Sequence, residues 1–318
     1  MLVSQRQADA LLVLIALIWG TTFTVVHGSV AAFPVWAFLA LRFGVAAAVF
    51  LPTLVRDRSV LSWPTLKVGV LLGTLLWIGF ATQSFGLRYT TPARAGFVTG
   101  LNVVLVPLLG LLFGQRPPLR AVVGVALAVV GLAILSWGCY LPGMTCTTAA
   151  ASLPQQQWGD LLVLLCAWAF AMHIVAVGRW ATRLSVVAVN TIQLIVVAVL
   201  AGVASMVVDR PLPLPAAPVS FAALYLGLVA TALVFALQLK LQRYTSATHT
   251  ALIFALEPVF AAFFSWLWTG EALTPAILLG GGLMLLGVVA AEVPWPRSAT
   301  LPGRGQSARA EVSLDVDV

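Results

Sequence analysis

Ten long apolar runs dominate the chain and restrict the folds that are open to it. A helix needs roughly 20 apolar residues to cross the hydrocarbon core of a bilayer, where the backbone must satisfy all of its own hydrogen bonds. With 61% of its 318 residues hydrophobic and only 8% charged, the chain carries far fewer charges than a soluble domain. The sequence therefore predicts an all-α integral membrane protein with ten transmembrane helices, near residues 8–27, 34–55, 65–86, 93–114, 119–137, 159–180, 185–208, 219–239, 247–269 and 274–293.

The basic residues are distributed unevenly around these runs, and this indicates an orientation. If the N-terminus is cytoplasmic, the outer side holds Arg88, Arg94 and Arg210, while Arg42 lies within a run. The positive-inside rule then predicts a multi-pass protein of the cytoplasmic (inner) membrane with both termini in the cytoplasm. The net charge of +7 is therefore an orientation signal and does not indicate a nucleic-acid partner. The inner loops and tail would hold the remaining basic residues: Arg6, Arg56, Arg58, Lys67, Arg116, Arg120, Arg179, Arg183, Lys240, Arg243, Arg297, Arg304 and Arg309.

The chain repeats itself. Residues 88–104 read RYTTPARAGFVTGLNVV, and residues 243–259 read RYTSATHTALIFALEPV. In this alignment Asn102 falls where Glu257 falls, and both are polar side chains in apolar surroundings. We interpret the echo as a duplication that covers nearly the whole chain.

Each predicted repeat contains five helices, and this odd number determines how the halves are related. The second half must enter the membrane from the opposite side, which gives two inverted five-helix repeats. Transporters built from inverted repeats bind their substrates near the bilayer midplane, where the halves meet. We expect the first repeat at residues 1–145, the second at 155–296, and a polar, disordered cytoplasmic tail at 297–318.

Four stretches carry a family resemblance: LIWGTTFTV, FLALRFGVAA, GLRYTTPARAGFVTGLNVVLVPLLGLLFGQRP and YTSATHTALIFALEPVFAAFFSWLWTGEALTP. In these motifs the chain resembles the ten-helix, EamA-type members of the drug/metabolite transporter superfamily. Gln115 and Arg116 depart from the family pattern, which commonly has an acid there, whereas Thr269-Gly270-Glu271 follows it. The resemblance implies export or exchange of small metabolites through a central cavity, usually driven by a gradient.

Polar side chains within the predicted spans are candidate substrate contacts, because a polar group in hydrocarbon normally faces a cavity or a partner. Asn102 and Glu257 both fall at the midplane, from opposite halves. The alternative for the amides is hydrogen bonding between helices, and for His173 a satisfied buried histidine. The predicted substrate contacts are Trp19, Thr22, Gln83, Thr99, Asn102, Trp168, His173, Asn190, Gln193, Gln238 and Glu257.

Glu257 is the carboxylate that we place in the middle of a span, so we predict that it couples transport to a gradient. An acid there can alternate between a proton and a cationic or amino-bearing substrate. The alternative is a permanently protonated acid bonded to a neighbouring helix. For Arg42 we expect a mainly structural role, and for Pro107 and Pro258 kinks that serve as gating hinges or as static bends.

Two further functions share some of these features. A lipid flippase has the same architecture but needs a lateral opening between helices. A membrane-embedded enzyme is less favoured, because no catalytic or metal-ligand motif appears in the sequence. The sequence also has no phosphate-binding loop, which disfavours transport driven by ATP. We therefore expect no catalytic residue, cofactor or metal.

The fifth and tenth runs are rich in glycine (VVGVALAVVGLA and LLGGGLMLLGVVA), which suits close helix packing within the chain or in a homodimer through these helices. We expect both runs to pack outside the helices that enclose the cavity. Cys139 and Cys146 lie in one predicted outer loop and form either a disulfide or two free thiols. Cys166 is expected to be a small core residue.

Overall fold

The computed structural model describes residues 5–56, 58–111, 119–137, 153–181, 184–210, 214–241, 253–254 and 256–292. This part of the chain is helical throughout and contains no strand. Six of its helices are long and apolar enough to cross a membrane, and three shorter apolar helices accompany them. The α-helices are α1 (Gln5–Ala32), α2 (Val35–Arg56), α3 (Trp63–Gly86), α4 (Pro92–Gly100), α5 (Asn102–Gly110), α6 (Leu119–Trp137), α7 (Leu153–Ala176), α8 (Val186–Val208), α9 (Ala217–Leu224), α10 (Val234–Leu241), α12 (Glu257–Thr269) and α13 (Pro275–Glu292).

Three short segments of other helical types connect them. The 3-10 helix η1 (Arg58–Leu61) precedes α3, the π-helical segment η4 (Val177–Ala181) follows α7, and the π-helical segment η5 (Tyr225–Leu233) joins α9 to α10. Local π-helical geometry is tolerated in a membrane where neighbouring helices satisfy the backbone.

The fourth predicted span is interrupted. Instead of one helix over 93–114, α4 ends at Gly100 and α5 begins at Asn102, with Leu101 forming a turn between them. The Leu101 amide donates to the Val98 carbonyl at 3.2 Å. This bond spans three residues, as in a 3-10 helix, and not the four residues of an α-helix. The interruption precedes Asn102, and α5 continues through Pro107 to Gly110, so the kink at Pro107 stays a prediction.

Pro258 lies at the start of a helix, and its predicted role as a gating hinge or a static bend stays a prediction. It lies in the first turn of α12, where a proline's missing N–H leaves no helical hydrogen bond unmade. The same helix ends at Gly270, whose φ of 68° lies in the left-handed region that favours glycine.

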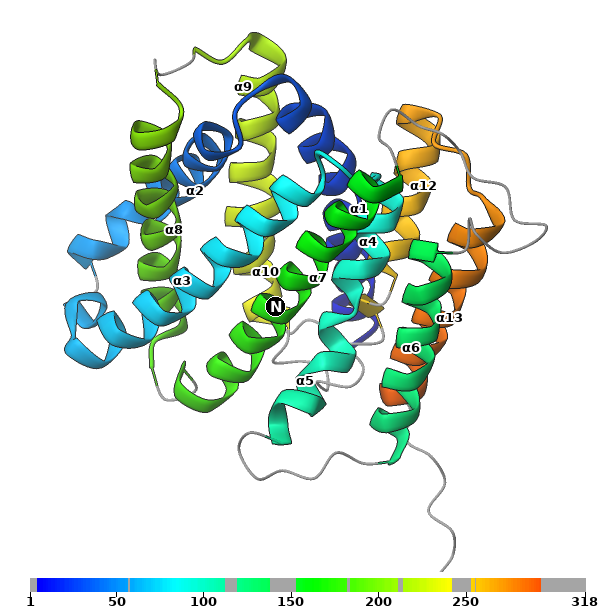
Figure 1. Cartoon of the computed structure of the whole chain (residues 1–318). Coiled ribbons are helices and arrows are strands. Elements are labelled where there is room, and N and C mark those ends of the chain that lie inside the picture. Colours follow the sequence, from blue (N-terminus) through cyan, green and yellow to red (C-terminus); the bar gives the residue numbers. More distant parts are fainter. Residues whose placement is uncertain are drawn as a thin grey trace, which may run out of the picture.

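Helices from the two halves of the chain pack in pairs (Figure 1). The helices α6 and α13 lie side by side at one flank, α2 packs on α8 at the other, and α12 contacts α1 and α4 between them. At the α6–α13 contact, a Cβ added to Gly124 would lie 2.5 Å from the Gly287 carbonyl oxygen, and one on Gly131 would lie 2.5 Å from that of Gly280. These glycine faces therefore pack against each other within the chain.

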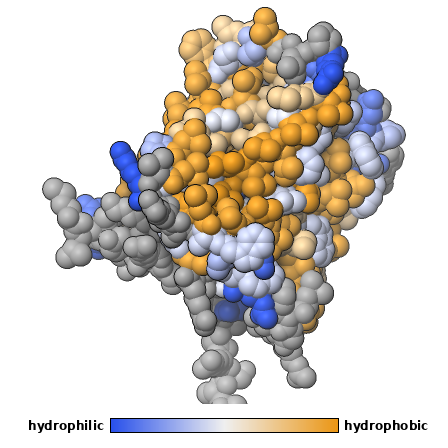
Figure 2. Space-filling model, turned by 90° about the vertical axis from the view of Figure 1, so that its left-hand side faces the viewer, coloured by the Kyte–Doolittle hydropathy of each residue, from blue (hydrophilic) through white to orange (hydrophobic). Residues whose placement is uncertain are grey.

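Large apolar side chains cover much of the surface. Figure 2 shows hydrophobic residues over most of one face, with hydrophilic residues gathered toward its edges. Exposed examples are Val207, Phe221 and Leu286, each more than half exposed. A soluble monomer rarely presents so large an apolar surface, so these residues face the lipid of a multi-pass membrane protein.

Candidate functional site

A polar cluster forms where α3, α4, α7 and α12 meet. The Gln83 amide nitrogen on α3 donates to the Thr99 hydroxyl on α4 at 3.3 Å. The Cys166 thiol on α7 interacts with the side chains of both Thr99 and Glu257. The structure thus brings together three predicted substrate contacts, Gln83, Thr99 and Glu257, from both halves of the chain.

Sequence reasoning missed Cys166, which was expected to be an ordinary core residue. It is fully buried, its thiol is hydrogen-bonded to the Thr99 side chain, and it lies within range of an electrostatic interaction with Glu257. A cysteine within an apolar run gives no sign of such neighbours, because a small buried thiol fits an apolar core equally well.

Small residues bring the start of α12 into this cluster. A Cβ on Gly20 of α1 would lie 2.4 Å from that of Phe260, and one on Gly100 of α4 would lie 2.9 Å from the Pro258 ring. Close helix approach of this kind depends on residues without side chains. Substitution at either glycine would push α12, and with it Glu257, away from α1 or α4.

Glu257 and Asn102 begin α12 and α5, respectively, and both side chains are half-buried. Among the described residues, neither side chain makes a hydrogen bond, and Glu257 forms no ion pair. Polar groups at such depth are normally satisfied. Among the described residues, nothing competes with a ligand, a proton or water for these two groups.

A second polar group joins α7 to α8. His173 Nε2 and Gln193 Oε1 are 3.0 Å apart, and Gln193 Nε2 donates to Asn190 Oδ1 at 2.7 Å. Because the Gln193 oxygen accepts, His173 donates from Nε2 in this arrangement. The chain of bonds ends at Asn190 Nδ2, a buried donor without a partner.

The two repeated tryptophans lie in different surroundings. Trp19 Nε1 donates to the Ala230 carbonyl of η5 at 3.1 Å, and its ring centroid lies 5.1 Å from that of Phe254. The Thr22 hydroxyl donates to the Trp19 carbonyl at 2.7 Å and so is used within α1. Trp168 instead lies on the outward face of α7 at 38% exposure, and is not brought together with the other predicted contacts.

Arg42 is buried in α2 and has no carboxylate partner among the described residues. Its guanidinium lies 4.7 Å from the Phe80 ring centroid and 5.1 Å from that of Phe43. Nη2 donates to the Thr231 hydroxyl at 3.4 Å. Aromatic faces can stabilise a desolvated cation, which fits the structural role expected for this residue.

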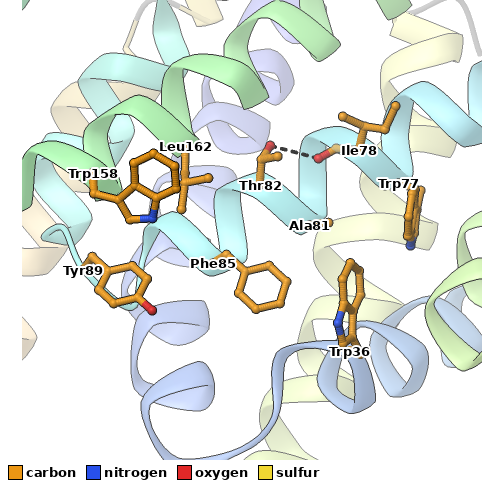
Figure 3. A pocket seen from close by; sticks show the side chains of 9 residues that line it. All are labelled: Trp36, Trp77, Ile78, Ala81, Thr82, Phe85, Tyr89, Trp158 and Leu162. Atoms are coloured by element: carbon orange, nitrogen blue, oxygen red, sulfur yellow. Dashed lines mark hydrogen bonds between the residues drawn. The ribbon is translucent and has the colours of Figure 1, made fainter. Parts of the chain in front are cut away.

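A separate aromatic pocket of about 390 Å³ opens between α2, α3 and α7 (Figure 3). The Trp36 and Trp77 rings stack across it with their centroids 5.5 Å apart. The Thr82 hydroxyl at its edge is bonded to the Ile78 carbonyl of its own helix, whereas the buried Trp77 Nε1 has no hydrogen-bond partner among the described residues. Its lining includes none of the predicted substrate contacts: it comprises Trp36, Trp77, Ile78, Ala81, Thr82, Phe85, Tyr89, Trp158 and Leu162.

Some predicted features lie outside the described residues: the side chains of Gln238 and Pro107, the Cys139–Cys146 loop, and the tail at 297–318. Within the described ranges, no group of three or more His, Cys, Asp or Glu side chains is placed to hold a metal ion.

Comparison with known proteins identifies the family. The model of the EamA-like transporter family matches residues 6–137 and again residues 157–291. The chain belongs to the EamA-like transporter family. The EamA fold is that of a membrane protein, in agreement with the apolar helices described above, and the resemblance in the sequence motifs is confirmed.

Relatives of this EamA protein are named as transporters. An uncharacterized transporter of Archaeoglobus fulgidus is 32% identical over 90% of this chain and 86% of its own length. The S-adenosylmethionine/S-adenosylhomocysteine transporter of Chlamydia trachomatis serovar L2 is 25% identical over 87% and 86%. A solved crystal structure with 20% sequence identity shares the fold, with a TM-score of 0.62 over 90% of this chain and 97% of that one.

Proposed function

We propose that this EamA protein is a secondary transporter of small organic metabolites that works by alternating access between two inverted five-helix repeats. The observation that carries the proposal is the Glu257 carboxyl, which is left without a protein partner among the described residues, beside Thr99 and Cys166. A metabolite with a cationic or amino group would bind there, in exchange for a proton.

The helix contacts support the inverted repeat. In a ten-helix arrangement, α2 and α8 are equivalent helices of the two halves, and so are α6 and α13; both pairs pack on each other. The contact of α3 with α8 is matched by that of α2 with α9 and η5. If the halves are related by a two-fold axis, a helix next to the axis packs on its own equivalent, and every other contact between halves occurs twice with the two halves exchanged. Two matches of one family model along the chain support it as well.

The named relatives suggest a sharp first test of substrate class. S-adenosylmethionine carries a positive sulfonium that S-adenosylhomocysteine lacks, so the pair reports on charge recognition at nearly constant shape. We would measure counterflow in liposomes with both compounds and with a panel of amino-bearing, neutral and anionic metabolites. Preference for cationic or amino-bearing solutes supports the proposal, whereas exclusive transport of anions contradicts it.

We also propose the cytoplasmic membrane and two cytoplasmic termini, as the distribution of Lys and Arg favours. A cysteine at position 146 should then react with an impermeant maleimide added outside. Labelling only from the cytoplasm would reverse the orientation.

The aromatic pocket favours one other candidate, a lipid or lipid-precursor flippase, because a lateral opening is what such a protein needs. The polar cluster argues for a soluble solute instead. Loss of outer-leaflet fluorescence from a labelled lipid in proteoliposomes, without metabolite counterflow, would favour the flippase.

A further inference from the structure

Three carboxylates of the second half gather at one end of the helix bundle, and each of them reaches across to the first half. Asp160 lies near the start of α7, Asp209 caps the end of α8, and Glu271 follows α12. This end is the one where α2 and α4 begin, in the upper half of Figure 1. It is separate from the polar cluster around Glu257.

Asp160 holds the start of α4. It forms a buried ion pair with Arg94: the Arg94 side chain is 5% exposed and the Asp160 side chain 4%. Asp160 also accepts hydrogen bonds from the hydroxyls of Thr90 at 2.6 Å and Ser136 at 3.0 Å. The Arg94 guanidinium donates in addition to the Leu135 carbonyl of α6. The carboxylate is therefore fully satisfied by groups of the first half.

Asp209 and Glu271 bind the free backbone amides at the starts of two first-half helices. Asp209 Oδ2 accepts from the Ala37 amide in α2 at 3.0 Å, and Glu271 Oε2 accepts from the Ala93 amide in α4 at 3.2 Å. Amides in a first helical turn have no intrahelical acceptor and carry a positive partial charge. A carboxylate from the other half thus acts as a helix cap.

The start of α4 also carries a local substitute for this cap. Thr91 occupies the N-cap position, yet its hydroxyl makes no capping bond and is buried without a hydrogen-bond partner among the described residues. An N-cap threonine ordinarily accepts a bond from an amide of the first turn. This unused hydroxyl would cap α4 once Glu271 withdrew, so the helix start has two alternative partners.

We propose that Asp160, Asp209 and Glu271 form a seal that closes the transport path at this end, and that their release from α2 and α4 opens it. The proposal rests on the alternating-access function. In the structure all three contacts are made, so we assign it to the state that is closed at this end. Removing a carboxylate contact therefore favours the state that is open at this end, and Thr91 stabilises that open state.

The native thiol of Cys166 provides the reporter, because it is buried beside Glu257 beyond the seal. In full-length protein with Cys139 and Cys146 replaced by serine, we would measure labelling of Cys166 by an impermeant thiol reagent, in cells and in inverted vesicles. A Leu214→Cys variant, exposed at the same end, identifies the side that faces the seal.

We expect Glu271→Gln and Asp209→Asn to raise the rate of Cys166 labelling from the seal's side by about tenfold each, because a neutral amide oxygen accepts a weaker hydrogen bond from the helix start than a carboxylate does. Glu292→Gln, the same chemical change at the far end of α13, should leave the rate unchanged. Adding Thr91→Ala to Glu271→Gln should lower the rate again, because the open state loses its cap.

Unchanged labelling in folded Glu271→Gln and Asp209→Asn protein would overturn the seal. So would an equal rise in Glu292→Gln, or a further rise on adding Thr91→Ala, which would indicate simple loosening. The assay needs no substrate, so its failure would leave the metabolite transport proposal standing, and the absence of counterflow would not affect its outcome.

Discussion

The proposed seal and the polar cluster each hold a carboxylate in different surroundings: Asp160 is buried, whereas Glu257 is half-buried. Asp160 is surrounded by Arg94, Thr90 and Ser136, while the described residues provide Glu257 with no hydrogen-bond or ion-pair partner. A satisfied buried charge fixes two helices together, whereas an unsatisfied one costs free energy unless something else occupies it. The comparison therefore distinguishes the region around Asp160, which fixes helices to each other, from the region around Glu257, which we propose binds a ligand.

The largest effect should follow from breaking the ion pair at the seal. Asp160→Ala leaves the Arg94 guanidinium buried and unpaired, which should lower the free energy of unfolding by about 3–5 kcal/mol. Thermal unfolding of the purified protein in detergent measures this. The paired change Arg94→Met with Asp160→Leu should recover most of the loss, and a single-variant loss below about 1 kcal/mol would refute the contrast between the two regions.

A smaller loss of stability is expected at the α6–α13 contact. Gly131→Ala places a methyl 2.5 Å from the Gly280 carbonyl oxygen, and such overpacking should cost about 1–3 kcal/mol. Gly282→Ala, where a Cβ meets nothing within 4 Å, is the matched control. Equal unfolding temperatures for both variants would mean that this close contact is absent.

The predicted amides should divide into two groups. Gln193→Ala removes both bonds that link His173 to Asn190 and leaves buried groups unpaired, so we expect a stability loss of about 1–3 kcal/mol. Asn102→Ala breaks no bond among described residues and should alter substrate affinity with little change in unfolding temperature. Comparable destabilisation by both changes would assign Asn102 to interhelical bonding as well.

The smallest effects belong to Trp168. Because this side chain lies on the outward face of α7, Trp168→Leu should change stability by no more than about 0.5 kcal/mol and leave counterflow intact. Trp19→Leu, its repeat equivalent, should impair transport because its indole bonds to η5. Loss of counterflow in folded Trp168→Leu protein would indicate that Trp168 is a substrate contact after all.

The sequence predicted the features that depend on composition and periodicity. Membrane helices follow from apolar length, while the midplane positions of Asn102 and Glu257, inferred from their depth in two repeated spans, stay a prediction. Both arguments use only distance along a helix.

The remaining features depend on contacts between distant segments. The helix interruption at Leu101 is not indicated by the residue at that position, because leucine is an ordinary helix residue. The carboxylate caps of α2 and α4 come from residues more than a hundred positions away. The outward position of Trp168 depends on how α7 is rotated against α3, α4 and α5, and a repeated tryptophan does not reveal that rotation.

The central claim is that the carboxyl of Glu257 couples substrate movement to protons. The direct measurement is substrate accumulation in proteoliposomes with an imposed pH gradient, comparing wild type, Glu257→Gln and Glu257→Asp, with folding checked by size-exclusion chromatography. We predict that Glu257→Gln retains exchange but loses its response to the gradient, and that Glu257→Asp keeps part of that response. Full gradient-driven accumulation with an unchanged pH profile in folded Glu257→Gln protein would contradict the claim.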